Sequence, residues 1–239
     1  MAIGMAHPVS AYLNASIDIG NAVYVKKILT DKWESLGTYS CFACLMHIRQ
    51  HAERPYEELQ IAKMLMQMLK DNDGDEYIYD MWEVICDYPD LGMIKLFHEN
   101  TDVDLHFKGD CLFYNVCKHG KRDAIRYLVA QGFDPKDDDY RAFRIAILSA
   151  RDHTLLKMTH MSKLSQDELD SLLLFACEDG NHHCVRSMVS AGADIFKHWK
   201  QIGRMTRTTS PIQQSSLQRY LSELRVDYKQ YKRMKRLQQ

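Results

Sequence analysis

The chain of 239 residues is 46% hydrophobic and 26% charged, so it can bury a continuous core, and disorder is excluded for most of it. It lacks an uncharged apolar run of about 18 residues, which would span a membrane, and the opening pattern of a secretory signal. We therefore expect a soluble, cytoplasmic protein. The formal net charge of −1 is unevenly spread, because residues 1–196 carry 20 basic and 30 acidic side chains whereas residues 197–239 carry 11 and 2.

One apolar pattern returns along the chain about every thirty residues. The same apolar position of the pattern is found at six places, with separations of 36, 33, 31, 30 and 30 residues: Val25, Ile61, Ile94, Ile125, Leu155 and Val185. A period between about 20 and 50 residues is typical of solenoids, in which each unit buries its apolar face only against its neighbours. The sequence therefore predicts a helical repeat.

Each of the later units has an earlier apolar segment, with residues at positions i, i+1, i+4 and i+5. In three successive units these residues are Leu112, Phe113, Val116 and Cys117, then Ala142, Phe143, Ala146 and Ile147, then Leu172, Leu173, Ala176 and Cys177. This spacing predicts one face of a helix. Gly120 and Gly180 follow the first helix, and Gly132 and Gly192 follow the second, where glycine supplies the left-handed conformation that closes a helix. Each unit is thus predicted to be helix–turn–helix.

The segment from Ala176 to Ile195 resembles the second half of an ankyrin repeat, and the segment from Val116 to Pro135 is a second match. The resemblance extends weakly over residues 9–196, as about six repeats. It departs from the family because the Thr-Pro-Leu-His opening is replaced, for example by Cys-Leu-Phe-Tyr at residues 111–114. It implies an all-α, ankyrin-like solenoid of degenerate repeats. Divergent viral and bacterial ankyrin proteins are similar, so a viral or phage source and a role in host–virus interaction are left open.

A basic amphipathic helix is predicted at the C-terminal end of the sequence. Ser210-Pro211 is typical of a helix start, and a helix of roughly 25 residues would be about 38 Å long. Its apolar face holds Leu217, Leu221, Leu224, Tyr228 and Tyr231. The remaining faces are dominated by Arg219, Arg225, Lys229, Lys232, Arg233, Lys235 and Arg236. Residues 203–209 are expected to be a flexible basic link, so residues 1–196 and 197–239 are two parts of different character.

Five roles remain open for this tail. Its cations and tyrosines are suited to neutralising phosphates and stacking bases, which favours nucleic-acid binding. Its apolar face is equally suited to capping the last repeat, or to pairing two chains as a coiled coil. An anionic membrane surface is a weaker alternative. Docking of the basic tail on the acidic remainder of the chain would also satisfy the charges.

The sequence does not favour an enzyme. It holds no nucleophile elbow, phosphate-binding loop, His-Glu-x-x-His or dinucleotide fingerprint, and we expect no catalytic residue and no cofactor. Asp71, Asp73 and Asp75 alternate as in a calcium loop, but the glycine falls at the fourth position and Trp82 stands at the twelfth. This segment and residues 137–139 are therefore interpreted as solvated acidic turns.

One group of cysteines and histidines has a spacing that suits zinc. Cys41, Cys44, His47 and His51 would project from one side of a helix. However, they lie where the first helix of the second repeat is predicted, and cysteine is common on buried apolar faces, so core packing is favoured over metal binding. The same applies to His182, His183 and Cys184. The seven cysteines are an odd number, and we expect free thiols in a reducing compartment.

The ankyrin resemblance implies binding through the concave surface, which the first helices and the excursions between repeats form. The excursions are predicted near residues 75–80, 104–110, 134–140, 163–170 and 194–200. Exposed aromatic residues carry much interface energy, so five are predicted to be partner anchors: Tyr77, Tyr79, Phe107, Tyr140 and Trp199. The alternative is that each packs on an adjacent repeat. The favoured function is a non-catalytic scaffold that holds, and inhibits or redirects, one or more proteins, whose identity stays open together with the oligomeric state.

Overall fold

All the regular structure that the coordinates describe is helical. The computed structural model describes residues 13, 15–17, 21–31, 43–45, 55–72, 74–205 and 211–237. No strand occurs among these residues, which confirms the prediction of an all-α fold. Their contacts divide the chain into two compact units, Met1–Leu112 and Phe113–Gln239, and each is described by itself.

The first unit contains helical residues 22–31 and the helices α3 (Pro55–Lys70), α4 (Asp75–Asp87) and α5 (Leu91–Asn100), together with the start of α6 (Phe107–His119). Helices α3, α4 and α5 all contact one another. Between α4 and α5 the Trp82 and Phe97 rings stack with their centroids 6.2 Å apart. The Trp82 indole also donates a hydrogen bond of 3.1 Å to the Asp104 carbonyl, so it holds the following loop.

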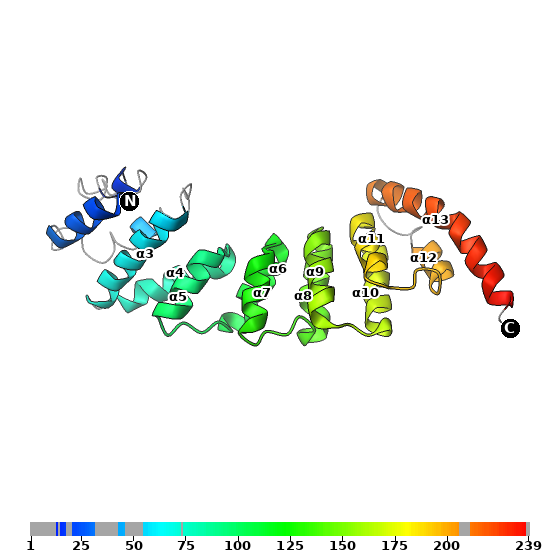
Figure 1. Ribbon diagram of the computed structural model, residues 1–239, viewed down its shortest axis with the longest axis horizontal. Helices are drawn as coiled ribbons and strands as arrows, with labels where there is room; N and C mark the ends of the chain where they lie inside the picture. The colour runs from blue at the N-terminus through cyan, green and yellow to red at the C-terminus, as the bar shows by residue number, and fades with distance from the viewer. Residues whose placement is uncertain are drawn as a thin grey trace, which may run out of the picture. The chain divides into compact units, whose positions relative to one another are not determined.

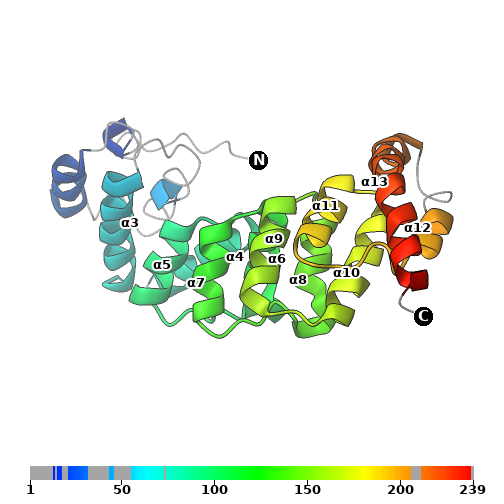
Figure 2. The ribbon, with the colours of Figure 1, turned by 45° about the vertical axis from the view of Figure 1, so that its right-hand side comes forward.

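The second unit begins within α6 and continues through seven helices among the described residues. These are α7 (Arg122–Ala130), α8 (Asp137–Leu148), α9 (Asp152–Ser162), α10 (Gln166–Asp179), α11 (His182–Ser190), α12 (Trp199–Met205) and α13 (Pro211–Leu237). Helix α8 pairs with α9, and α10 pairs with α11. Between these pairs, α8 contacts α10 and α9 contacts α11, so that first helices lie beside first helices and second beside second (Figure 1; Figure 2).

The predicted core positions are buried. All six periodic residues, from Val25 to Val185, lie in helices and are fully buried. The twelve residues predicted to form one face of the first helices, between Leu112 and Cys177, are also buried. Sequence periodicity therefore identified the face of each helix that the core covers.

Positive φ angles occur where the sequence predicted the turns. Gly120 has φ of 71° and Gly180 of 82°, and both close a first helix. Gly132 and Gly192 both have φ of 108° after the second helices α7 and α11. At the equivalent of Gly120 and Gly180 in the intervening pair, Ala150 adopts φ of 54°. Alanine carries a Cβ, which makes this conformation unfavourable.

Two predicted excursions end as expected. Residues 108–110 and 138–140 are left-handed, with φ between 51° and 64°, so the regular right-handed parts of α6 and α8 begin at Cys111 and Arg141. The excursion predicted at 194–200 is also largely a loop, since α12 begins at Trp199.

Two other predicted excursions are wrong or too long. Residues 75–80 are the first turns of α4, where Asp75 and Glu76 lie at the positive end of the helix dipole. The excursion predicted at 163–170 stops at Ser165, which caps α10. There the Ser165 side chain accepts a hydrogen bond from the Glu168 amide, and the Glu168 carboxylate accepts one from the Ser165 amide, which is a capping box.

The C-terminal helix is confirmed, since α13 runs from Pro211 to Leu237. The link predicted over residues 203–209 is partly wrong, because residues 203–205 belong to α12, and residues 206–210 lie outside the described ones. Helix α12 contacts α10, and α13 contacts α11, so they occupy the places that a further helix pair would take. Ile202 in α12 and Leu217 in α13 are fully buried. The contact with α11 is the one that the capping alternative requires.

Candidate functional site

The five predicted aromatic anchors are divided between the two units. In the first unit, Tyr77 and Tyr79 lie on α4 rather than in a loop. Tyr79 is 56% exposed and Tyr77 is half-buried. Phe107 is half-buried, and the Lys108 ammonium lies 5.2 Å from its ring centroid. Of these three, Tyr79 alone is exposed enough to anchor a partner without rearrangement.

The two anchors of the second unit make internal contacts. The Tyr140 hydroxyl donates a hydrogen bond of 2.6 Å to Glu168, and this bond, together with those from Ser165 and Lys136, lowers the pKa of Glu168 to about 2. Trp199 stacks on Tyr228 with 4.6 Å between ring centroids and 19° between planes. For Tyr140 and Trp199, the structure thus has the intramolecular packing that the sequence had left as the alternative.

A different set of side chains forms a continuous surface on the first helices, opposite their buried face. We call it the first-helix surface, and it consists of Tyr114 on α6, Arg141, Arg144, Ile145 and Leu148 on α8, and Leu174 and Phe175 on α10. Leu148 is 61% exposed. The Arg141 guanidinium lies 4.5 Å from the Tyr114 ring centroid, and the Arg144 guanidinium lies 5.4 Å from that of Phe175. Arginine and aromatic rings therefore connect the three helices.

The arginines of this surface are held from both sides. Arg141 pairs with Asp138 at 2.9 Å, and Arg144 pairs with Asp139 at 2.8 Å. Both carboxylates lie in the left-handed turn at the start of α8, so this turn positions the guanidinium groups over the rings of neighbouring helices. Because the carboxylates balance the charge, the surface offers apolar and planar groups rather than a strong field.

A second candidate site is a groove between α13 and the segment before and within α12. We call it the basic groove, and its lining includes the rings of Phe196, Tyr228 and Tyr231 and the cations Lys200, Arg204, Lys232 and Lys235. Its volume is about 530 Å³. Phe196 lies 5.3 Å from Tyr231 and 6.1 Å from Tyr228, centroid to centroid, so aromatic packing joins the two walls.

The seven cations predicted as the basic tail, from Arg219 to Arg236, are all exposed on α13. Only Lys232 and Lys235 among them line the basic groove. Their ammonium groups lie 5.6 Å from the Tyr228 centroid and 5.8 Å from the Tyr231 centroid. Within the described part of the chain, no carboxylate forms an ion pair with Lys200, Arg204, Lys232 or Lys235.

A buried carboxylate fixes the other side of this region. Asp170 accepts hydrogen bonds from the Asp194 amide at 2.9 Å, the Lys197 ammonium at 2.9 Å and the His198 ring at 3.1 Å. Burial alone would raise the pKa of Asp170, but these hydrogen bonds and one from Gln166 outweigh burial and lower it below its ordinary range. The loop that leads into the basic groove is thereby tied to α10.

The described cysteines are free thiols with raised pKa values. Burial raises the pKa of Cys44, Cys117, Cys177 and Cys184 to about 12, so these thiols stay protonated at neutral pH and are poor nucleophiles. Of the proposed zinc ligands, Cys41, His47 and His51 lie outside the described residues. Within those residues no group of three or more His, Cys, Asp or Glu side chains is arranged to hold a metal ion.

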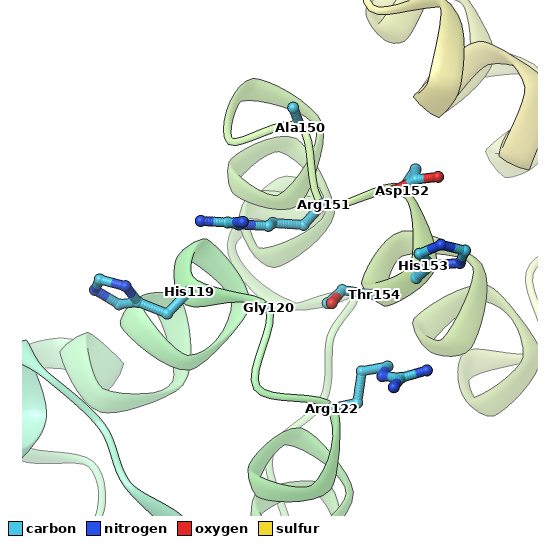
Figure 3. A pocket seen from close by; sticks show the side chains of 8 residues that line it. All are labelled: His119, Gly120, Arg122, Ala150, Arg151, Asp152, His153 and Thr154. Carbon is cyan, nitrogen blue, oxygen red and sulfur yellow. The ribbon is translucent and has the colours of Figure 1, made fainter.

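A polar pocket of about 240 Å³ lies at the turns between helices of the second unit. Figure 3 shows that its side chains do not converge, because Arg151 extends towards His119 while Arg122 points the other way. The Arg151 guanidinium donates a hydrogen bond of 2.9 Å to the Lys118 carbonyl, which gives it a structural role.

Comparison of the chain with protein-family models, curated proteins and solved structures finds no match. No helix among the described residues is both long and apolar enough to cross a membrane. The function must therefore be inferred from the surfaces of the molecule. The sequence had predicted the use of first helices but had placed the anchors in the excursions. The signal for the first-helix surface was available in the sequence, because residues 144 and 145 recur 30 residues later as residues 174 and 175, opposite the core positions.

Proposed function

We propose that the chain is a non-catalytic, ankyrin-like repeat scaffold, and that it binds a partner protein through the first-helix surface. The observation that carries the proposal is the alignment of Tyr114, Arg141, Arg144 and Phe175 across three successive first helices, with exposed Leu148 beside them. The stacking of α8 on α10 and of α9 on α11 supports an ankyrin-like arrangement. In such an arrangement the first helices face the concave side.

The residue types on this surface support protein binding. Tyrosine and arginine are enriched among residues that contribute most to protein–protein affinity, and they act best when neighbours hold them in place. Here the carboxylates of Asp138 and Asp139 and the adjacent rings provide that support. Leu148, Ile145 and Leu174 add apolar area next to them. The expected occupant is a partner segment that presents apolar side chains.

The test is affinity capture with the full chain from cells of its source, followed by mass spectrometry. A variant of the first-helix surface, Arg144→Ala with Leu148→Ser, is expected to lose the partners that the unchanged protein retains. The matched control is Arg126→Ala with Leu156→Ser on the second helices α7 and α9, which should retain them.

The proposal is wrong if the unchanged protein enriches no protein, or if the first-helix variant keeps the same partners in the same yield. Circular dichroism and thermal melting of both variants separate lost binding from lost folding. Because Arg144 and Leu148 are not among the buried core residues, the first-helix variant is expected to keep the helical signal.

A further inference from the structure

The basic groove is a second site, independent of the first-helix surface. Its rings are fixed in place, since Trp199 stacks on Tyr228 and Phe196 lies within 6.1 Å of both Trp199 and Tyr228. The half-buried Tyr231 ring lies at its edge, 6.4 Å from Tyr228. A ligand that binds there loses little conformational entropy in the protein, because the aromatic rings are already packed in place.

The charge of this groove is not balanced by its surroundings. Lys197 and His198, which also line it, are bound to Asp170. The four other cations, Lys200, Arg204, Lys232 and Lys235, have no ion-pair partner in the part of the chain that the structure describes. Concentrated positive charge in a groove attracts an anion, and the acidic character of residues 1–196 does not satisfy it here.

The cations continue beyond the groove along α13. Arg225, Lys229, Lys232 and Arg236 are spaced by 4, 3 and 4 residues, so they form one stripe along the helix. This stripe is about 16 Å long at 1.5 Å per residue. A linear polyanion fits such a stripe better than a single small anion does.

We propose that the basic groove and the adjoining stripe of α13 bind single-stranded nucleic acid. Lysines and arginines along a groove neutralise phosphates, and aromatic rings beside them stack on bases. A single strand exposes its phosphates and the faces of its bases at the same time. A duplex hides the faces of its bases, and an acidic peptide has carboxylates but no bases to stack on the tyrosine rings. The half-buried Tyr228 and Tyr231, each with a lysine ammonium near its ring, offer both kinds of contact.

The test is fluorescence anisotropy with the full chain and a labelled 12-nucleotide oligothymidine, titrated from low to moderate salt. The unchanged protein is expected to bind with an affinity that falls as salt rises. Lys232→Gln with Lys235→Gln should weaken binding roughly tenfold and reduce the steepness of log K against log salt by about 1.4, at about 0.7 per phosphate contact. The matched control, Arg219→Gln with Arg233→Gln, removes two exposed α13 cations that do not line the groove and should have a smaller effect on both quantities.

A third variant separates stacking from charge. Tyr231→Leu is expected to lower the affinity while leaving the salt dependence unchanged, because it removes a ring and no charge. A 12-base-pair duplex, polyglutamate and vesicles containing phosphatidylserine serve as competitors, and each should compete more weakly than unlabelled oligothymidine.

The proposal is overturned by absent binding, by a flat salt response, by equal losses in the groove and control variants, or by a competitor that matches the single strand. A melting temperature within a few degrees of the unchanged protein is required of every variant. Any of these failures leaves the first-helix surface and its protein partner untouched, because that surface shares no residue with the groove.

Discussion

Replacing Ala150 with glycine is expected to stabilise the protein. Ala150 has φ of 54°, and the equivalent residues of the neighbouring pairs are Gly120 and Gly180, at 71° and 82°. The turn at Ala150 and the turn at Gly120 have the same backbone hydrogen bond. The Arg151 amide bonds to the Ala146 carbonyl at 2.8 Å, and the Lys121 amide bonds to the Val116 carbonyl at 3.0 Å. These bonds are those of a helix end whose left-handed residue is usually glycine.

The magnitude follows from two opposing effects. A left-handed conformation costs a residue with a Cβ about 1–2 kcal/mol. Glycine removes that cost, but it loses about 0.5–1 kcal/mol more conformational freedom than alanine on folding. The net gain for Ala150→Gly is therefore about 0.5–1 kcal/mol in free energy of unfolding. For a chain of this length that corresponds to a rise of about 1–4 °C in melting temperature.

Urea and thermal unfolding followed by circular dichroism at 222 nm measure this change. The matched control is Ala130→Gly at the exposed end of α7, which should lower stability by about 0.5–1 kcal/mol because that alanine is in a right-handed helix. The reverse change, Gly120→Ala, should also destabilise, since the new Cβ would lie 3.1 Å from Cδ of Arg151. If Ala150→Gly lowers the midpoint as much as Ala130→Gly does, the argument from backbone strain is refuted.

Two further predictions concern the end of the second unit. Asp170→Asn should lower stability by about 1–3 kcal/mol at neutral pH, because the buried side chain would lose its charged hydrogen bonds with Lys197 and His198; an unchanged urea midpoint would contradict this. Since the pKa of Asp170 is lowered in the folded state, its contribution to the free energy of unfolding is present above the unfolded pKa of about 3.9 and is lost as the pH falls below that value. The free energy of unfolding of the variant should therefore change less with pH in the acid range than that of the unchanged protein. Leu217→Ala should cost about 2–5 kcal/mol if α13 caps the stack through this fully buried side chain, whereas a tail that only binds a ligand would show no such loss in thermal melting.

The sequence predicted the all-α fold and the buried faces because both depend on local spacing. The apolar period of 30 to 36 residues requires each helix pair to cover the next, and that requirement does not depend on the identity of loop residues. The prediction was wrong for residues 75–80, which were interpreted as an excursion from their phase in the repeat but form the start of α4. Four core residues follow it at the expected spacing, namely Met81, Trp82, Ile85 and Cys86. They lie 31 residues before Leu112, Phe113, Val116 and Cys117, so the helix could have been predicted.

The start of α10 could also have been predicted from sequence. Ser165 is followed three residues later by Glu168 and then by an apolar run, which is the pattern of a capping box. The contacts of the aromatic residues could not be predicted from the sequence. Trp199 and Tyr228 are 29 residues apart and belong to no shared repeat position, so only the packing of α13 brings their rings to 4.6 Å. Pairing between distant segments decides which aromatic residues remain available to a partner.

The charge boundary near residue 196 is not a boundary in the packing of the described helices. Helix α12 contacts α10, and α13 contacts α11, just as α10 and α11 contact α8 and α9. Ile202 is buried 30 residues after Leu172, which itself lies 30 residues after Ala142, so the period continues into the basic part. The charge is expected to change without a change in packing where the stack of helix pairs continues but its surface binds a different ligand from that of the preceding pairs. This reasoning links the two proposals: the same helical period positions a nearly neutral arginine–aromatic surface on α6, α8 and α10, and then an unbalanced basic groove at α12 and α13.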